Sequence, residues 1–328
     1  MTYLSIRDLS VRLRNGPPLL RRVSLDVEAG EVRALVGESG AGKSMIGKAV
    51  LGILPPSVEI SGGQILLDGT DLLTLPPKDR RRRIGASCAL IPQDPLTALN
   101  PSHRIGPQIT DRLVDILGWT RADAEARAKA LLAEVQIPDP DRVLRAYPHE
   151  LSGGMRQRIL IASAFAAEPK LIVADEPTTA LDVTVQRQVL DLFRDLRREL
   201  GTALVLITHD LGVVAGLCDR VAVMYAGRVV ERATTDRLFA APRHPYGAGL
   251  LAAMPRVDER PDRPLGTIPG APPDLRRPPA GCAFRPRCAR AAADCAVAPA
   301  LVGDERDAVA CHRPLAGPAA VDGAPGAP

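Results

Sequence analysis

The sequence predicts an α/β protein with a parallel sheet at its core, and three observations lead to this fold class. Residues 37–44 fit the pattern G-x-x-x-x-G-K-[ST], which joins a strand to a helix and cradles phosphate groups. Two apolar runs, 171–174 and 203–207, are followed by ionisable residues, as buried parallel strands are where their carboxyl ends open onto a crevice. Residues 100–136 instead carry apolar side chains at helical spacing.

The composition describes a globular chain that is long enough for a full core and about two domains. It has 328 residues, of which 46% are hydrophobic, and a mean hydropathy of +0.02. No apolar run approaches the roughly eighteen residues of a membrane span, and residues 1–8 lack the features of a signal peptide, so we expect the chain in the cytoplasm. A net charge of +4 with 3% aromatic residues gives no reason to expect a nucleic-acid partner.

The N-terminal residues predict two antiparallel strands before the phosphate-binding loop. Apolar residues alternate over 4–13 and again over 23–27, before a turn at 28–30. Residues 32–36 then predict a short buried strand, and residues 45–51 a helix. The loop therefore has the flanking strand and helix that its pattern requires, which an ordinary glycine turn would lack.

The loop residues explain how a triphosphate would be held. Three glycines let consecutive backbone N–H groups converge on phosphate oxygens, at the positive end of the following helix dipole. Lys43 is expected to reach the β- and γ-phosphates, and the Ser44 hydroxyl to bind Mg²⁺. The complete loop is Gly37, Glu38, Ser39, Gly40, Ala41, Gly42, Lys43 and Ser44.

Residues 64–93 predict a strand, a basic helix and a second short strand. Residues 64–69 are typical of a strand that ends in a turn. The run 78–83 carries five basic residues without an aromatic residue among them, which favours a solvated helix face over a nucleic-acid site. The apolar run 89–92 brings Gln93 to a strand end, where it is a candidate ligand of Mg²⁺ or of the attacking water, although a lone glutamine is usually ordinary surface.

A helical subdomain is predicted over about residues 100–165. Its first helix carries an apolar stripe and its second spans about 124–135. The stripe consists of Ile105, Ile109, Leu113, Ile116 and Leu117. Ser152 is a good N-cap for a further helix through residue 167, with Gly153 and Gly154 in its first turn. Because the loop already cradles one nucleotide, this second glycine-rich helix start is expected to face a nucleotide held by another subunit, which predicts a dimer.

Ionisable residues follow both buried strands of the predicted parallel sheet. Neighbouring side chains on a strand point to opposite sides, so Asp175 is expected in the Mg²⁺ shell and Glu176 near the water that attacks the γ-phosphate. Asp182 is the predicted N-cap of the next helix. His209 follows the strand 203–207 and so belongs to the same sheet edge as the loop. In isolation, two terminal acids or one histidine would more often be structural.

Together these residues resemble the ATP-binding cassette (ABC) ATPases over about residues 4–235. The resemblance implies the Walker A loop at 37–44, the Q-loop glutamine at Gln93, the signature at 151–155 and the Walker B aspartate at Asp175. It further implies the catalytic glutamate at Glu176, the dimer-interface loop at Asp182 and the switch histidine at His209. The family commonly stacks an aromatic ring on adenine where this chain has Leu13, which leaves apolar contact from Leu13 or Val23 as the substitute. The residues expected to act in catalysis are Glu176, His209, Gln93 and Lys43.

Three further stretches resemble the ATPases of oligopeptide and dipeptide importers, a pattern that nickel importers share. They are Gly154–Arg158, Glu176–Thr184, and residues 244–246 with 250–255. In that family two related ATPases pair beneath two membrane permease subunits, an extracellular binding protein delivers the solute, and this chain resembles the first of the two ATPases. The resemblance implies a peripheral protein at the cytoplasmic face of the inner membrane that uses ATP and Mg²⁺ to import di- or oligopeptides, or alternatively nickel or another small solute.

The sequence divides into an ATP-binding domain at 1–235, a cysteine-containing extension at 236–314 and a disordered tail at 315–328. Eight prolines within 255–280 predict an irregular linker rather than a second core. A non-transport ABC protein is a competing class, but only 107 residues separate Ser44 from Ser152, too few for a long coiled-coil insertion. A small-molecule kinase would not explain the signature.

Four cysteines predict a metal staple in the extension, which has few apolar residues of its own. They are Cys282, Cys288, Cys295 and Cys311. Zinc is the default for four cysteines, but its structural sites usually begin with two ligands about two to four residues apart. The spacing C-x5-C-x6-C-x15-C is wider and suits an iron–sulfur cluster, and some peptide-importer ATPases resemble this segment and carry a [4Fe–4S] cluster there. Zinc and free thiols remain alternatives. Cys88 and Cys218 are expected to be buried thiols.

Overall fold

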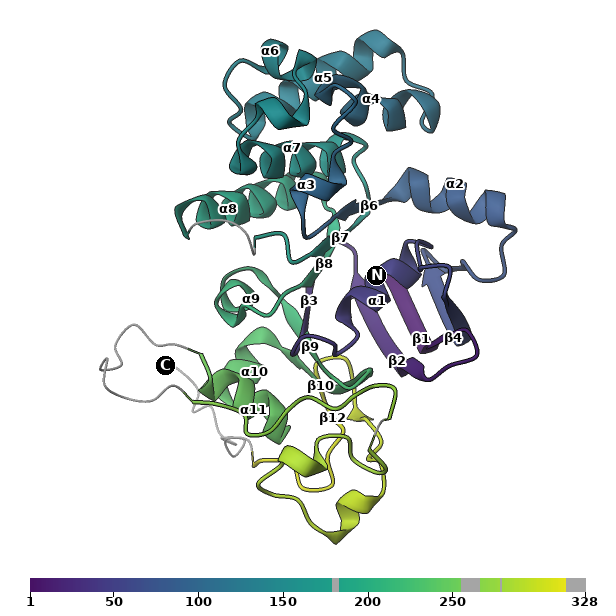
Figure 1. Ribbon diagram of the computed structural model, residues 1–328, viewed down its shortest axis with the longest axis vertical. Coiled ribbons are helices and arrows are strands. Elements are labelled where there is room, and N and C mark those ends of the chain that lie inside the picture. The colour runs from purple at the N-terminus through teal and green to yellow at the C-terminus, as the bar shows by residue number, and fades with distance from the viewer. Residues whose placement is uncertain (179–182, 255–265, 278, 317–328) are drawn as a thin grey trace, which may run out of the picture.

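The computed structural model describes residues 1–178, 183–254, 266–277 and 279–316. Figure 1 shows a core sheet running through the middle of the molecule, with a small antiparallel sheet on one side. A layer of helices lies beyond one end of the core sheet, and the C-terminal extension lies beyond the other. The predicted α/β class, with its antiparallel and helical subdomains, is confirmed.

Two sheets contain the strands of the described residues. The antiparallel sheet consists of β1 (Thr2–Leu13), β2 (Pro18–Glu28), β4 (Val58–Leu67) and β5 (Thr70–Asp71) in the order β2-β1-β4-β5. The core sheet consists of β3 (Val32–Val36), β6 (Cys88–Ile91), β7 (Leu171–Asp175), β8 (Ala203–Ile207), β9 (Arg220–Tyr225), β10 (Arg228–Thr234), β11 (Val302–Gly303) and β12 (Asp307–Val309). Its order is β11-β12-β10-β9-β3-β8-β7-β6.

Helices surround the core sheet. They are α1 (Lys43–Val50), α2 (Pro77–Ser87), α3 (Pro95–Ala98), α4 (Ile105–Asp115), α5 (Arg121–Glu134), α6 (Pro140–Arg145), α7 (Gly153–Ala166), α8 (Val183–Leu200), α9 (Leu211–Leu217), α10 (Thr235–Ala240) and α11 (Pro245–Ala252). Short 3₁₀ turns occupy Pro148–Glu150, Arg285–Arg287 and Ala293–Ala296. Among these described helices, none has the length and apolar character needed to cross a bilayer.

The core sheet is parallel where the phosphate-binding loop begins. β3 lies between β8 and β9 and is parallel to both, and β6, β7 and β8 are parallel neighbours. Every residue of β3 and β8 is buried, as expected for parallel strands covered on both faces. Because the carboxyl ends of parallel strands meet at one edge, the residues that follow them converge there. Those residues are Gly37 after β3, Gln93 after β6, Glu176 after β7 and His209 after β8.

The antiparallel sheet confirms the predicted N-terminal strand pair. Leu4 of β1 pairs with Val27 of β2 on one side and with Leu67 of β4 on the other. The buried residues of β1 form one core with the apolar side of α1, which includes Ile46 and Val50. This packing ties the start of the phosphate-binding helix to the antiparallel sheet.

The helical layer follows the predicted stripe with one exception. Ile105, Ile109 and Leu113 of α4 are buried against α5 and α7. Ile116, which the stripe included, is instead 45% exposed, because α4 ends at Asp115 and Ile116 is its C-cap. The next helix, α5, begins at Arg121 behind the N-cap Thr120, earlier than the apolar spacing indicates.

The C-terminal extension is less irregular than its composition predicts. β12 pairs with β10 and with β11, so the extension adds two strands to the core sheet. The sheet therefore continues past residue 235, the predicted end of the ATP-binding domain. Phe284 is buried against the rings of Tyr225 and Tyr246. In the described parts of residues 266–301 the only regular elements are two 3₁₀ turns.

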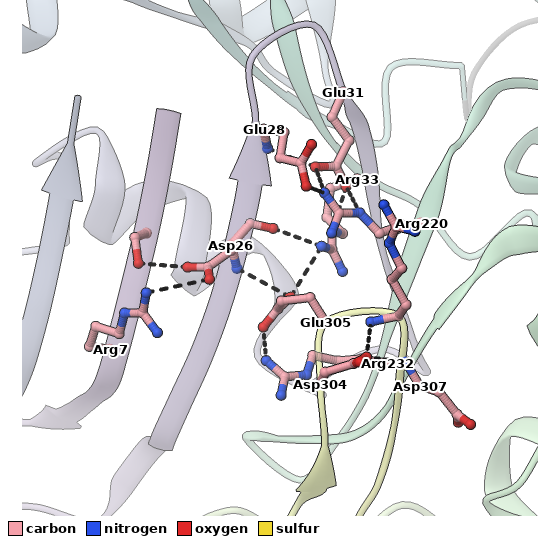
Figure 2. A network of polar contacts seen from close by, with 12 residues as sticks. Arg7, Asp26, Glu28, Glu31, Arg33, Arg220, Arg232, Asp304, Glu305 and Asp307 are labelled. Carbon is pink, nitrogen blue, oxygen red and sulfur yellow. Dashed lines mark hydrogen bonds and ion pairs between the residues drawn. The ribbon is translucent and has the colours of Figure 1, made fainter. Parts of the chain in front are cut away.

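A buried ion-pair network joins the extension to both sheets (Figure 2). Arg33 of β3 is fully buried and donates through Nε to Glu31 at 3.0 Å and through Nη2 to Glu305 at 3.1 Å. Glu305, from the turn between β11 and β12, also pairs with Arg232 of β10. A buried guanidinium is tolerated only with such partners. Glu305 of the β11–β12 hairpin therefore helps to neutralise the charge of Arg33 in β3, the strand that leads into the phosphate-binding loop.

Candidate active site

The loop at 37–44 is shaped by glycines that a larger residue could not replace. Gly37 has φ +150°, and a Cβ there would lie 2.3 Å from the Met224 carbonyl oxygen of β9. Gly42, the N-cap of α1, has φ +100°, and a Cβ there would lie 2.7 Å from Leu20 of β2. The loop is thus pressed against strands of both sheets, with its backbone turned toward the start of α1.

Lys43 lies at the centre of the loop. Its Nζ donates to the carbonyl oxygens of Gly37 at 2.7 Å and of Glu38 at 3.1 Å, and the residue is 6% exposed. Burial lowers the pKa of this ammonium, while the nearby charges of Glu176 and Asp175 act in the opposite direction. The cation is therefore held inside the loop by weak acceptors that phosphate oxygens would replace.

Ser44 and Asp175, two residues predicted to bind Mg²⁺, are joined by a hydrogen bond. The Ser44 hydroxyl donates to Oδ1 of Asp175 at 2.9 Å, which connects the first turn of α1 to the end of β7. Desolvation raises the pKa of the Asp175 carboxyl, and the hydrogen bond from Ser44 partly offsets that effect. A hydroxyl and a carboxylate side by side are hard oxygen ligands of the kind that Mg²⁺ accepts together with phosphate.

Glu176 lies between the ends of three strands. Its backbone has φ +48°, and its N–H donates to the Ile207 carbonyl of β8 at 2.8 Å. The carboxylate accepts a hydrogen bond from Gln93 Nε2 at 3.0 Å and lies 3.3 Å from Nδ1 of His209. The structure thus brings the predicted residues Gln93 and His209 to the carboxylate of Glu176 at the sheet edge.

His209 is positioned by the residues on either side of it. Asp210 donates its N–H to the Thr208 hydroxyl at 3.0 Å and caps α9 by accepting from the Gly212 N–H at 2.8 Å. The imidazole itself remains 58% exposed, so its outer face is available to a phosphate.

Comparisons with known proteins identify the family. A family model described as ABC transporter matches residues 20–179, and one described as oligopeptide/dipeptide transporter, C-terminal region, matches residues 230–295. The oligopeptide transport ATP-binding protein OppD of Bacillus subtilis is 47% identical over 285 residues, which cover 86% of this chain and 80% of that protein. The chain belongs to the ABC transporter family. The probable D,D-dipeptide transport ATP-binding protein DdpD of Escherichia coli is 49% identical over 90% of each chain.

Solved structures share the ABC fold. An ATP-binding subunit of an ABC transporter has a TM-score of 0.60 at 30% identity, and the match covers 72% of this chain and 91% of that one. A component of the cbiONQ ABC transporter complex of Clostridium perfringens has a TM-score of 0.64 at 27% identity, covering 73% and 91%. The chain is therefore an ABC ATPase, and its substrate is ATP with Mg²⁺.

The signature residues of this ABC ATPase lie apart from its phosphate-binding loop. Ser152 caps α7 by accepting from the Met155 N–H at 3.3 Å, and both Ser152 and Gly153 are exposed. Figure 1 shows α7 in the helical layer and α1 beside the antiparallel sheet. Within the described residues, no hydrogen bond or ion pair joins residues 152–154 to residues 37–44, and Asp182 lies outside the described residues.

Leu13 ends β1 at the rim of the antiparallel sheet. It is half-buried, packs against the core of that sheet, and its N–H donates to the Pro17 carbonyl at 3.1 Å. An aliphatic side chain at this position offers an adenine ring apolar contact without ring stacking.

The four predicted cysteine ligands surround one cavity. A small cavity is lined by Cys282, Cys288, Cys295 and Cys311, together with His244 and several arginines. Burial raises the thiol pKa of Cys282 and of Cys311, and the other cysteines of the group add to the effect. Among the described residues, no three Cys, His, Asp or Glu side chains converge as a single metal ion requires.

Cys88 and Cys218 are buried thiols, as predicted. Desolvation raises the thiol pKa of Cys88 to about 11, and that of Cys218 rises for the same reason. Both therefore stay protonated and unreactive at neutral pH.

Sequence reasoning missed two residues that contact the loop. Glu38 donates its N–H to the Tyr246 hydroxyl and pairs through its carboxylate with Arg287. Tyr246 belongs to a stretch that resembles peptide-importer ATPases, and Arg287 precedes a predicted cysteine ligand. Neither position carries a spacing signal that links it to residues 37–44.

Proposed function

We propose that this chain is the ATP-hydrolysing subunit of an importer of dipeptides or oligopeptides. The observation that carries the proposal is the set of relatives named oligopeptide or dipeptide transport ATP-binding proteins, which are 42% to 49% identical over most of the chain. The C-terminal match at 230–295 adds support, because this region lies outside the match to the general ABC model.

The proposed phosphate and metal ligands follow from the geometry at the start of α1. Lys43 neutralises the β- and γ-phosphates, where the charge of the transition state develops. Ser44 and Asp175, whose Oγ and Oδ1 atoms are 2.9 Å apart, would hold Mg²⁺, with Gln93 as a further ligand. These residues fit the ion because all supply oxygen ligands at one edge of the sheet.

Glu176 is proposed as the group that orients the attacking water and takes up its proton. Gln93 and His209 hold its two carboxylate oxygens, at 3.0 Å and 3.3 Å, so the carboxylate cannot rotate freely. His209 then reaches the γ-phosphate with its exposed face. Phosphoryl transfer needs positioning and neutralisation more than covalent chemistry, and this arrangement supplies both.

The proposed assembly pairs this chain with a second, homologous ATPase beneath two membrane permease subunits. The signature start at Ser152–Gly154, in which Ser152 and Gly153 are exposed, has no phosphate-binding loop beside it in the chain, which supports a site completed by two subunits. Asp182 is proposed to lie at that interface. The chain is then peripheral, at the cytoplasmic face of the membrane, and the extracellular binding protein contacts it only indirectly.

The four cysteines of the extension are proposed to hold a [4Fe–4S] cluster. Zinc with four thiolates requires sulfur atoms about 3.8 Å apart around one ion, and the described thiols do not converge in this way. They nevertheless line one small cavity with Arg285, Arg290 and Arg313, whose positive charges suit the thiolates of a larger, anionic group.

Anaerobic purification tests the cluster. We expect brown protein with about four iron and four sulfide per chain, and a lower iron content after Cys→Ser substitution at any of the four positions. Cys88→Ser is the matched control, because that buried thiol lies outside the cavity. Colourless protein with one zinc per chain would assign the site to zinc, and protein without either metal would refute a metal site.

Transport in reconstituted vesicles tests the peptide proposal. The chain is assembled with its permease pair, its partner ATPase and the binding protein, and ATP-driven uptake of a labelled dipeptide, a labelled pentapeptide and Ni²⁺ is compared. We expect uptake of at least one of the two peptides and none of Ni²⁺. Uptake of Ni²⁺ alone would replace the peptide assignment, and ATP turnover without uptake of any of the three would remove it.

A further inference from the structure

We propose that Arg287 is a positioning residue for the phosphate-binding loop. Its guanidinium holds and neutralises Glu38, the second residue of the loop, and thereby makes the ATP affinity of the loop depend on the C-terminal extension. The inference rests on ATP binding by this chain and not on which solute the transporter carries.

The contact between the two residues is bidentate. Arg287 Nη1 donates to Glu38 Oε2 at 2.6 Å, and Nη2 donates to Oε1 at 2.9 Å. The Arg287 side chain is 4% exposed and that of Glu38 is 26% exposed. Paired, charge-assisted hydrogen bonds of this kind fix orientation as well as distance, and partial burial protects them from screening by salt.

Arg287 is itself held in place by contacts with three further residues. Its Nε donates to the Pro269 carbonyl at 2.9 Å, and its Nη2 to the Ile268 carbonyl at 3.2 Å. The guanidinium also lies over the ring of Tyr225, 5.9 Å from its centroid. The Arg287 guanidinium that binds Glu38 is therefore fixed by the extension and by Tyr225, the last residue of β9.

A second contact from the same part of the chain holds the backbone of Glu38. The Glu38 N–H donates to the hydroxyl of Tyr246 at 2.7 Å, and Tyr246 of α11 is completely buried. Tyr246 is oriented in turn by its own N–H, which donates to His244 Nδ1 at 3.0 Å. Both the backbone and the side chain of Glu38 are thus fixed by residues that follow the ATP-binding domain in the sequence.

Glu38 connects its contacts with Arg287 and Tyr246 to the phosphate site. Its carbonyl oxygen is one of the two acceptors that hold Lys43 Nζ. A shift of Glu38 would move that acceptor, and the loop would lose the preformed shape that spares ATP the cost of ordering it. Without Arg287, the carboxylate would also stand as an unpaired negative charge in a loop that must accept phosphates.

Equilibrium ATP binding by the full chain tests the proposal. Arg287→Gln keeps most of the buried stem and removes the charge, and we expect ATP binding to weaken roughly 2- to 30-fold. Arg287→Lys keeps the charge but cannot make the bidentate contact, so its ATP affinity should lie between those of the unsubstituted chain and Arg287→Gln. The matched control is Arg276→Ala, which breaks an exposed pair with Asp274 in the same extension and should leave the affinity unchanged.

A double-substitution cycle separates positioning from general loss of structure. If Arg287 acts by neutralising Glu38, then Arg287→Gln combined with Glu38→Ala should bind ATP more tightly than Arg287→Gln alone, because the unpaired carboxylate is gone. Losses that simply add would overturn the proposal, as would an unchanged affinity in folded Arg287→Gln. If that variant fails to fold, Arg287→Lys carries the test, and an unchanged affinity in it would equally overturn the proposal.

The assembled transporter provides an independent readout. A positioning role predicts a raised KM for ATP with kcat nearly retained in Arg287→Gln, because the groups that act on the water are untouched. A fall in kcat at unchanged KM would contradict it. Both quantities are measured on ATP turnover, so the outcome does not depend on whether the transported solute is a peptide.

Discussion

At the scale of single residues, we propose that hydrolysis depends on the carboxylate of Glu176. Glu176→Gln keeps the size and the contacts to Gln93 and His209 but removes the base. We expect ATP turnover by the assembled transporter to fall about 10²- to 10⁴-fold while ATP binding is retained. Near-normal turnover would mean that another group activates the water.

Lys43 provides the complementary prediction. Lys43→Ala removes charge-assisted contacts to the phosphates, and we expect ATP binding to weaken by about 1.5–3 kcal/mol, measured by titration of the full chain. Lys78→Ala, on the exposed first turn of α2, is the control. Equal affinities for the two variants would count against the loop as the nucleotide site.

The motif residues at the sheet edge were predictable from the sequence because each lies at or just after the end of a strand with a strong local pattern. The hydrogen bond between Ser44 and Asp175 was in this sense foreseeable, although 131 positions separate the two residues. The contact between Arg287 and Glu38 was not, since it spans 249 positions and neither partner has a motif that names the other. Only the structure shows that Glu38, a residue of the predicted ATP-binding loop, also binds Arg287 of the extension.

At the scale of elements, the β11–β12 hairpin is joined to the core by ion pairs as well as by the strand pairing of β12 with β10. Its strands have two and three residues, and Glu305 between them pairs with the buried Arg33 and with Arg232. Glu305→Ala would leave both guanidinium groups short of a partner. We expect a loss of roughly 3 kcal/mol in the free energy of unfolding.

Urea denaturation of the full chain measures this effect. Glu125→Ala, an exposed residue of α5, is the control and should change the free energy of unfolding very little. Equal stabilities of the two variants would show that the ion pairs at Arg33 do not hold the hairpin.

Short elements of this kind were beyond the reach of sequence patterns. A strand of two or three residues cannot display alternation, so the extension was predicted to be irregular. The longer elements, by contrast, carried enough residues to show their period, and β1, β7, β8 and α7 lie where the patterns indicated. The predicted apolar stripe extended past the end of α4. Ile116 keeps the helical spacing, but as the C-cap of α4 it is not buried.

At the scale of the whole molecule, the two glycine-rich helix starts lie on different parts of the fold. The start of α1 carries Lys43 and Ser44 and lies beside the carboxylate of Asp175, whereas the start of α7 is exposed in the helical layer. This separation supports the proposal that one chain supplies two half-sites and that a second subunit brings a signature to each nucleotide. The sequence predicted this arrangement, because the glycine-rich helix start at Ser152 has no nucleotide of its own when the loop at 37–44 already cradles one.

The central claim is that this ATPase works as one half of a shared site, and ATP turnover at low protein concentration tests it most directly. The chain is measured alone and after assembly with its permease subunits and partner ATPase. We predict slow turnover by the isolated chain, a large increase on assembly, and loss of that increase when this chain carries Glu176→Gln. Full turnover by the isolated monomer, undiminished by dilution, would contradict the account.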